Sequence, residues 1–201
     1  MRAALTSSLR GFFTIRIAFL KREVLGGEMA VHVALHPLFL YALSATMLWV
    51  VVSDAVHYII SNVLNAVILA LYITAVILLP IPGWLPALGA AGVVLVIGLG
   101  LFALGLMGGG DIKLLVVLSL WTGWGVQTLQ FIFLTAIFGG LLVILVLILR
   151  AIIPPILVRT NPARNLPRLL TRRQPVPYGI AIAAAFAWLL WTGGIPALPT
   201  T

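Results

Sequence analysis

Two aspartates are the side chains of this sequence best suited to acid–base chemistry. Each stands at the end of a long apolar stretch, where an ionised carboxylate is costly. Two carboxylates that share a partly desolvated site hold one proton between them near neutral pH. Such a pair provides a base that activates water and an acid that protonates a leaving amine. The 201-residue chain has only four acidic residues, which are Glu23, Glu28, Asp54 and Asp111.

A run of three glycines, Gly108, Gly109 and Gly110, directly precedes Asp111. Glycines leave no side chain in the approach to the carboxylate, so an extended peptide backbone can come within hydrogen-bond reach. They also interrupt a helix at a level that water can reach. Lys113 follows two residues later, and it has two open interpretations: it lowers the pKa of Asp111, or it extends toward the lipid headgroups.

The composition identifies the class of protein that must position these residues. Hydrophobic residues make up 63% of the chain and charged residues 8%, against about 25% charged residues in soluble domains. We therefore predict an integral membrane protein. The absence of cysteine excludes disulfides, thiolate metal sites and cysteine nucleophiles.

Six apolar segments have the character of membrane-spanning helices, which need about 20 mainly apolar residues. The fourth is the weakest, because residues 112–149 form one apolar run that we divide at its glycines and glutamines. Such continuous runs exclude the alternating strands of a membrane barrel. We predict an all-α, polytopic helical bundle with spans at 34–53, 64–79, 85–106, 112–124, 128–149 and 177–193.

The basic residues predict the orientation of these spans. Residues 150–173 contain six arginines and no acid, which is typical of a cytoplasmic loop; we place that loop at 150–176. Counting the spans backward places residues 54–63 and 107–111 on the same side. Both aspartates are therefore expected at the cytoplasmic boundary.

The N-terminal residues contradict this orientation. Five of the twelve basic residues lie between positions 1 and 28, and they would lie outside the cell if the first span begins near residue 34. Either this basic leader is an amphipathic or signal-like segment, or translation begins at Met29. In both cases residues 29–201 are predicted to form one membrane-embedded domain.

The motifs around the two aspartates resemble those of the type IV prepilin peptidases, membrane aspartic proteases with a Gly-x-Gly-Asp motif. The resemblance covers about residues 40–193. Three segments carry the resemblance: Asp54 with 55–62, residues 106–114, and residues 176–179. The last segment is similar to the short branch of the family that serves Flp-type, or tight-adherence, pili.

This resemblance implies that Asp54 and Asp111 are the catalytic residues, without a metal or another cofactor. The implied substrate is a prepilin or pseudopilin precursor, whose basic leader is cut on the cytoplasmic side immediately before its hydrophobic helix. Tyr178 and Gly179 either pack against the site or simply begin the sixth helix. The predicted site-shaping residues are Asn62, Gly108, Gly109, Gly110, Lys113, Tyr178 and Gly179.

Two features depart from the family pattern. The first motif usually contains Ile-Pro-Asn, whereas this chain has Ile60-Ser61-Asn62. Longer bacterial members also carry an N-methylating half with a cysteine-rich insert. Because this chain has no cysteine and no spare pair of spans, methyltransferase activity is not predicted.

Other functions agree less well with the sequence. A small proton-coupled transporter would use the paired aspartates as a relay, but both are expected at one membrane face. A structural subunit would leave the glycine run before Asp111 unexplained. We therefore predict a multi-pass peptidase of the bacterial inner membrane, with membrane lipid and the pilus assembly machinery as further candidate partners, and with no nucleic acid.

Overall fold

The computed structural model describes residues 35–79, 81, 83–160, 176–196 and 198. The predicted leader, residues 1–28, and most of the predicted cytoplasmic loop lie outside these residues. The chain divides into two compact units, residues 1–39 and 40–201. Of the first unit, only residues 35–39 are described, and they are helical. The second unit contains both aspartates.

All regular structure in the described residues is α-helical, which confirms the predicted fold class. Three helices are long and apolar enough to cross a membrane: Leu35–His57, Trp84–Ala103 and Val126–Ile153. The last is the apolar part of a longer helix. After the stretch Leu35–His57, the helices are α2 (Asn62–Leu78), α3 (Trp84–Ala103), α4 (Gly109–Thr122), α5 (Val126–Thr160) and α6 (Tyr178–Trp191).

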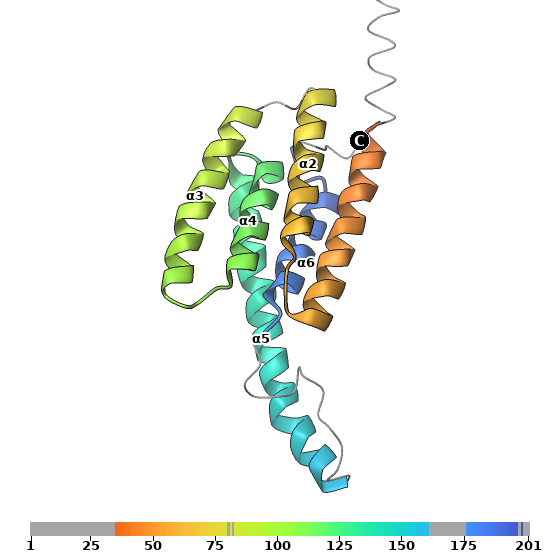
Figure 1. Cartoon of the computed structure of the whole chain (residues 1–201), viewed down its shortest axis with the longest axis vertical. Helices are drawn as coiled ribbons and strands as arrows, with labels where there is room; N and C mark the ends of the chain where they lie inside the picture. The colour runs from red at the N-terminus through yellow and green to blue at the C-terminus, as the bar shows by residue number, and fades with distance from the viewer. Residues whose placement is uncertain (1–34, 80, 82, 161–175, 197, 199–201) are drawn as a thin grey trace, which may run out of the picture. The chain divides into compact units, whose positions relative to one another are not determined.

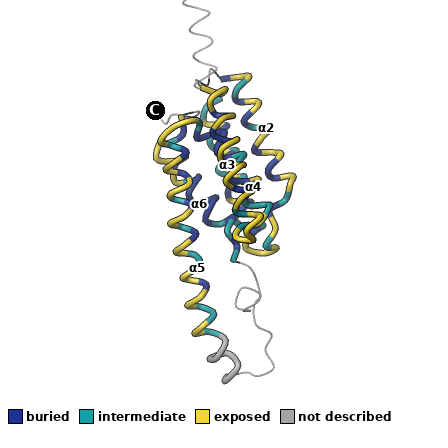
Figure 2. Tube along the Cα trace, turned by 90° about the vertical axis from the view of Figure 1, so that its left-hand side faces the viewer, coloured by how far each residue is buried: buried dark blue, intermediate teal, exposed yellow. Residues whose placement is uncertain are grey.

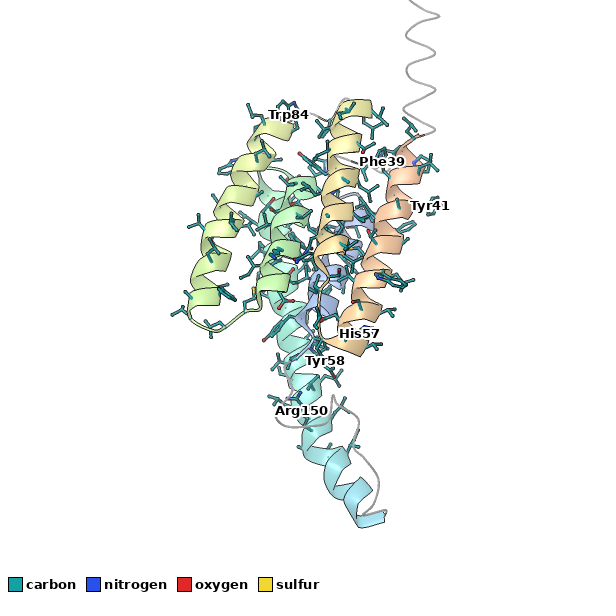
Figure 3. All side chains as sticks on the ribbon, viewed as in Figure 1. Phe39, Tyr41, His57, Tyr58, Trp84 and Arg150 are labelled. Atoms are coloured by element: carbon teal, nitrogen blue, oxygen red, sulfur yellow. The ribbon has the colours of Figure 1, made fainter. Side chains whose placement is uncertain are left out.

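Within the second unit, successive helices run in alternating directions (Figure 1). The connections 58–61 and 104–108 and the beginning of α6 therefore lie at the same end of the bundle, which we call the site end. The end of α2, the beginning of α3 and the connection 123–125 lie at the opposite end. Figure 3 shows this arrangement, with Tyr58 at the site end and Trp84 at the other.

The two shortest helices, α4 and α6, lie at the centre of the bundle. Their residues are mostly buried, whereas α3 and α5 expose much of their surface (Figure 2). α4 contacts α2, α3, α5 and α6. Edge-to-face ring contacts join Tyr72 to Trp121, at 5.4 Å, and Phe131 to Phe186, at 5.9 Å. The surrounding helices thus hold α4 and α6 in place, and the first turns of these two helices contribute to the site.

Two helix boundaries differ from the prediction by four residues or more. The first helix continues to His57 rather than ending near residue 53, so Asp54 lies in its last turn. α5 continues to Thr160, so residues 150–160 are helical rather than part of a loop. The apolar residues Ala151, Ile152 and Ile153 follow Arg150 without a glycine, and extending an existing helix costs little.

Candidate active site

Asp54 is the more deeply buried of the two aspartates. Its side chain is only 4% exposed. The backbone N–H of Ile180, in the first turn of α6, donates a hydrogen bond to its Oδ2 atom at 3.3 Å. The backbone of Gly179 also bonds to this carboxylate. A helix N-terminus carries partial positive charge and free N–H groups, so it is a favourable partner for a carboxylate.

Gly179 is required by this close approach. A Cβ atom at position 179 would lie 2.8 Å from Oδ2 of Asp54 and 2.8 Å from Cδ1 of Ile60. Both distances are shorter than any ordinary contact, so a side chain here would displace the carboxylate or its neighbour. The absence of a side chain at residue 179 thus allows α6 to reach Asp54.

The chain reverses about one helical turn after Asp54, through a residue in an unusual conformation. Tyr58 has φ of +57°, a left-handed conformation that is uncommon for residues other than glycine. Its N–H donates to the carbonyl of Asp54 at 3.0 Å, as in the left-handed helix caps that glycine usually forms. The hydroxyl of Ser53 donates to the carbonyl of Ile59 at 3.0 Å. These two bonds hold residues 58–60 against the end of the helix.

Ser61 explains how this connection is held without the proline of the family motif. Its side-chain oxygen accepts a hydrogen bond from the N–H of Val63 at 3.1 Å and caps the N-terminus of α2. Capping by serine stabilises a helix by about 1 kcal/mol. The substitution therefore replaces the restricted backbone of proline with a helix cap.

Asp111 lies in the first turn of α4, ahead of the apolar part of that helix. α3 ends at Ala103, and Gly105 follows with φ of +70°. Gly108 then caps α4 in an extended conformation, with φ of −75° and ψ of 147°. The backbone of Gly108 bonds to the Asp111 side chain. Asp111 is half-buried, so it is more open to water than Asp54.

Both carboxylates line one cavity of about 610 Å³ at the site end. Ile60 connects the two sides: its Cβ lies 3.4 Å from a Cβ placed at Gly110, and its Cδ1 reaches toward Gly179. Three segments of the chain form the lining, namely residues 58–60 with Asp54, residues 105–108 with Gly110 and Asp111, and residues 176–178.

The electrostatics of this cavity favour a proton on Asp111. The pKa of Asp111 is raised from 3.8 to about 6: burial is the largest cause, the nearby charge of Asp54 adds to the rise, and the hydrogen bond from the backbone of Gly108 opposes it. A carboxyl group with such a pKa is neutral in part of its population near physiological pH. The cavity can therefore hold one ionised and one protonated carboxyl group beside water.

The structure places the predicted site-shaping residues in different surroundings. Gly108, Gly110 and Tyr178 line the cavity, and Gly179 contacts Asp54. Gly109 does not line it: a Cβ there would meet only the ring of Phe102, at 3.7 Å. Of the three glycines predicted to open the approach to Asp111, Gly109 thus faces α3 instead of the cavity.

Lys113 and Asn62 are also absent from the cavity lining. The Nζ of Lys113 donates a hydrogen bond to Oδ1 of Asn62 at 2.9 Å, and both side chains are exposed. This bond joins the first turn of α2 to the first turn of α4. Both residues therefore contribute to the site by connecting the helices that carry its walls.

Several residues of the cavity were not predicted from the sequence. Tyr58, Ile60, Met107 and Pro177 line it beside the aspartates. The short separation of Asp54 and Tyr58 in the sequence could have predicted Tyr58 as a cavity residue. A helix that ends one turn after a carboxylate must place its next residues near that carboxylate. The left-handed conformation of Tyr58 had no sequence signal, because neither glycine nor asparagine stands there.

The described residues contain no cluster of three or more His, Cys, Asp or Glu side chains that could hold a metal ion.

Residues 41–145 match the model of the type IV leader peptidase family. The match includes both aspartates and ends before α6. No curated protein and no solved structure matches the chain.

Proposed function

The chain belongs to the type IV leader peptidase family, and on this premise we propose that Asp54 and Asp111 together hydrolyse the leader peptide bond of Flp-like prepilins. The family makes the protein an aspartic-type peptidase. Its apolar helices make it a multi-pass membrane protein. The catalytic roles of the two aspartates, the kind of pilin and the cellular membrane are our proposals.

One observation carries the catalytic assignment: two carboxylates, 57 positions apart in the chain, line the same cavity. In the proposed reaction, the ionised carboxylate takes a proton from a water molecule, and the water oxygen attacks the scissile carbonyl. The protonated carboxyl group then gives its proton to the departing amide nitrogen, and the C–N bond breaks. The pair titrates as one unit, so we assign base and acid to the pair as a whole.

The walls of the cavity suit an extended peptide. Gly108 and Gly110 line the side that carries Asp111, so substrate backbone meets no side chain at these two positions. Leu106 and Met107 provide apolar surface beside them. This combination favours a substrate held by its backbone next to a hydrophobic residue.

The basic residues support a cytoplasmic position for the site end. In the described residues, Lys113 lies near the beginning of α4 at that end, and Arg150 lies on the part of α5 that extends past it (Figure 3). Positive side chains accumulate on the cytoplasmic side of membrane proteins. We therefore propose that the bacterial inner membrane holds the protein with its cavity facing the cytoplasm, where a prepilin leader is located.

Co-expression with a candidate Flp-type prepilin tests the assignment. We expect Asp54→Ala and Asp111→Ala each to abolish leader cleavage, measured as a mass change of the pilin. His57→Ala is the matched control, because His57 is exposed one turn after Asp54 and does not line the cavity. Cleavage by both aspartate variants at normal protein levels would contradict the proposal. Proton flux without cleavage, lost in the same variants, would favour a transporter instead.

Labelling of single cysteines tests the orientation, since the chain has no natural cysteine. His57→Cys lies at the site end and Trp84→Cys at the opposite end, and both native residues are exposed. We expect a membrane-impermeant reagent added to whole cells to label position 84 and not position 57. The reverse pattern would place the cavity on the outer side.

A further inference from the structure

A groove with an entirely apolar lining runs between α5 and α6. It has a volume of about 240 Å³. Its α5 wall is formed by residues 138, 141, 142 and 145, which are spaced to lie on one face of a helix. Its α6 wall is formed by Ile180, Ala181 and Ala184. The α5 residues span about two helical turns, or roughly 10 Å.

The groove begins beside the catalytic cavity. Ile180 lines the groove, and its backbone N–H donates to Oδ2 of Asp54 at 3.3 Å. Tyr178 lines the catalytic cavity and packs on α5, where its ring lies 3.4 Å from a Cβ placed at Gly139. Only the first turn of α6 therefore separates the groove from the carboxylate.

The outer side of the groove is open in the described part of the chain. Leu141 is 60% exposed and Leu145 is 52% exposed, and Ala184 is exposed as well. Small residues at a helix surface in a membrane allow another helix to approach closely. Ala184 provides such a position on the surface of α6, next to the leucines of α5.

We propose that this groove binds the hydrophobic helix of the substrate, on the C-terminal side of the scissile bond. The inference rests on the proposed function. At the cut, the substrate backbone must be extended and near water, whereas beyond the cut it must be helical, because unpaired backbone groups are costly in lipid. A helix that begins at the cavity and continues along α6 away from the site end enters this groove.

This position also gives the enzyme a means of substrate selection. A soluble peptide with the same leader sequence has no apolar segment for the groove, so it gains nothing from this contact. A precursor with its helix gains the contact and is held at a fixed distance from Asp54. The groove therefore determines preference between substrates, while the aspartates carry out the same reaction on both.

Narrowing the groove tests the proposal. Ala184→Leu places a larger side chain in the groove, and Ala136→Leu is the matched control, because Ala136 is exposed on α5 and does not line the groove. Each variant is purified in detergent and given two substrates: the full precursor, and a soluble peptide that contains the leader and the cleavage site only. Thermal unfolding of each variant confirms that it is folded.

We expect Ala184→Leu to reduce cleavage of the full precursor by about tenfold or more and to leave cleavage of the soluble peptide unchanged. Ala136→Leu should cleave both substrates at wild-type rates. If Ala184→Leu cleaves the full precursor at the wild-type rate, the groove proposal is overturned while the proposed function is left intact. Failure of the wild-type protein to cleave either substrate would instead contradict the proposed function.

Photocrosslinking identifies the occupant of the groove directly. A photoreactive amino acid replaces Leu141 in an Asp111→Asn background, and the same amino acid at Ala136 is the control. We expect position 141, and not position 136, to crosslink to the hydrophobic helix of the precursor near its first turn. Crosslinks at position 141 to lipid alone would overturn the proposal.

Discussion

The two aspartates are held by two different kinds of structure. Asp54 lies in the last turn of a long helix, is 4% exposed and accepts a hydrogen bond from the N-terminus of α6. Asp111 follows a glycine-rich connection, begins a short helix and is half-buried. One carboxylate is therefore fixed by neighbours from distant parts of the chain, whereas the other is held mainly by its own segment.

This difference affects how firmly each carboxylate is positioned in the cavity. A carboxylate fixed by packing keeps a constant position against the substrate, which is the condition for efficient attack by a bound water. A carboxyl group in an open, glycine-lined wall can adjust to the substrate and exchange its proton with water. Substitutions beside each aspartate test this comparison.

The largest effect is expected at Gly179, beside the fixed aspartate. Gly179→Ala places a methyl carbon 2.8 Å from Oδ2 and 3.0 Å from Cγ of Asp54, so the carboxylate must move. A displacement of about 1 Å at a reacting group costs roughly 100-fold in rate, and we expect a loss of about that size in kcat/KM. Gly100→Ala is the control, because no atom lies within 4 Å of its added methyl group.

A double variant separates misplacement of the carboxylate from misfolding. The new methyl group in Gly179→Ala also meets Cδ1 of Ile60 at 2.8 Å, and Ile60→Val removes that atom. We expect the double variant to regain thermal stability but not activity. Recovery of both would mean that the position of Asp54 is not what limits the reaction, and the comparison between the aspartates would fail.

A smaller effect is expected at Gly108, beside the adjustable aspartate. In Gly108→Ala the methyl carbon lies 2.9 Å from Oδ2 of Asp111 but 3.8 Å from its Cγ, so rotation of the carboxyl group relieves the contact. The backbone at position 108 is in an ordinary extended conformation. We expect a loss of about tenfold in kcat/KM, which corresponds to ~1.4 kcal/mol.

The neighbouring glycine is the internal reference for that measurement. Gly109→Ala meets only the ring of Phe102, at 3.7 Å, and should remain close to wild-type activity. A loss at Gly109 equal to that at Gly108 would show that the whole connection, rather than the wall of the cavity, is sensitive. A loss at Gly108 larger than that at Gly179 would reverse the comparison between the two aspartates.

The sequence predicted the helices and the end of the bundle at which both aspartates lie. Apolar runs of about 20 residues define spans within a few positions, and alternating helices bring the ends of the first and third helices to the same side. Asp54 and Asp111 could be assigned to that side because each stands at such an end. This part of the site depends only on chain length and direction.

The contacts of the site depend on how each helix is rotated, which an apolar run does not determine. Gly108, Gly109 and Gly110 are equivalent in the sequence, yet only the first and third line the cavity. The bond between Lys113 and Asn62 and the approach of Gly179 to Asp54 likewise require knowledge of packing between helices. The left-handed turn at Tyr58 follows from the closure of a short connection rather than from its residue types.

The smallest effect is expected on stability, and it concerns the proton on Asp111. Its pKa in the folded protein is about 6, above the ordinary value of 3.8, so folding favours the protonated form. The wild-type protein should therefore lose stability as the pH rises from about 4 through 6, because the folded state must then hold a charge that the unfolded state holds more easily. Asp111→Asn has no ionisable group at position 111, so it should lack this contribution to the pH dependence.

Thermal unfolding in detergent across this pH range measures the difference. At pH 8 we expect Asp111→Asn to unfold a few degrees above the wild-type protein, at about 2–4 °C for each kcal/mol, and the gap should close near pH 4. Parallel curves for the two proteins would show that Asp111 does not hold the proton in the free enzyme. In that case the partly open wall of the cavity would leave Asp111 fully hydrated, and the shared proton would have to lie on the more deeply buried Asp54.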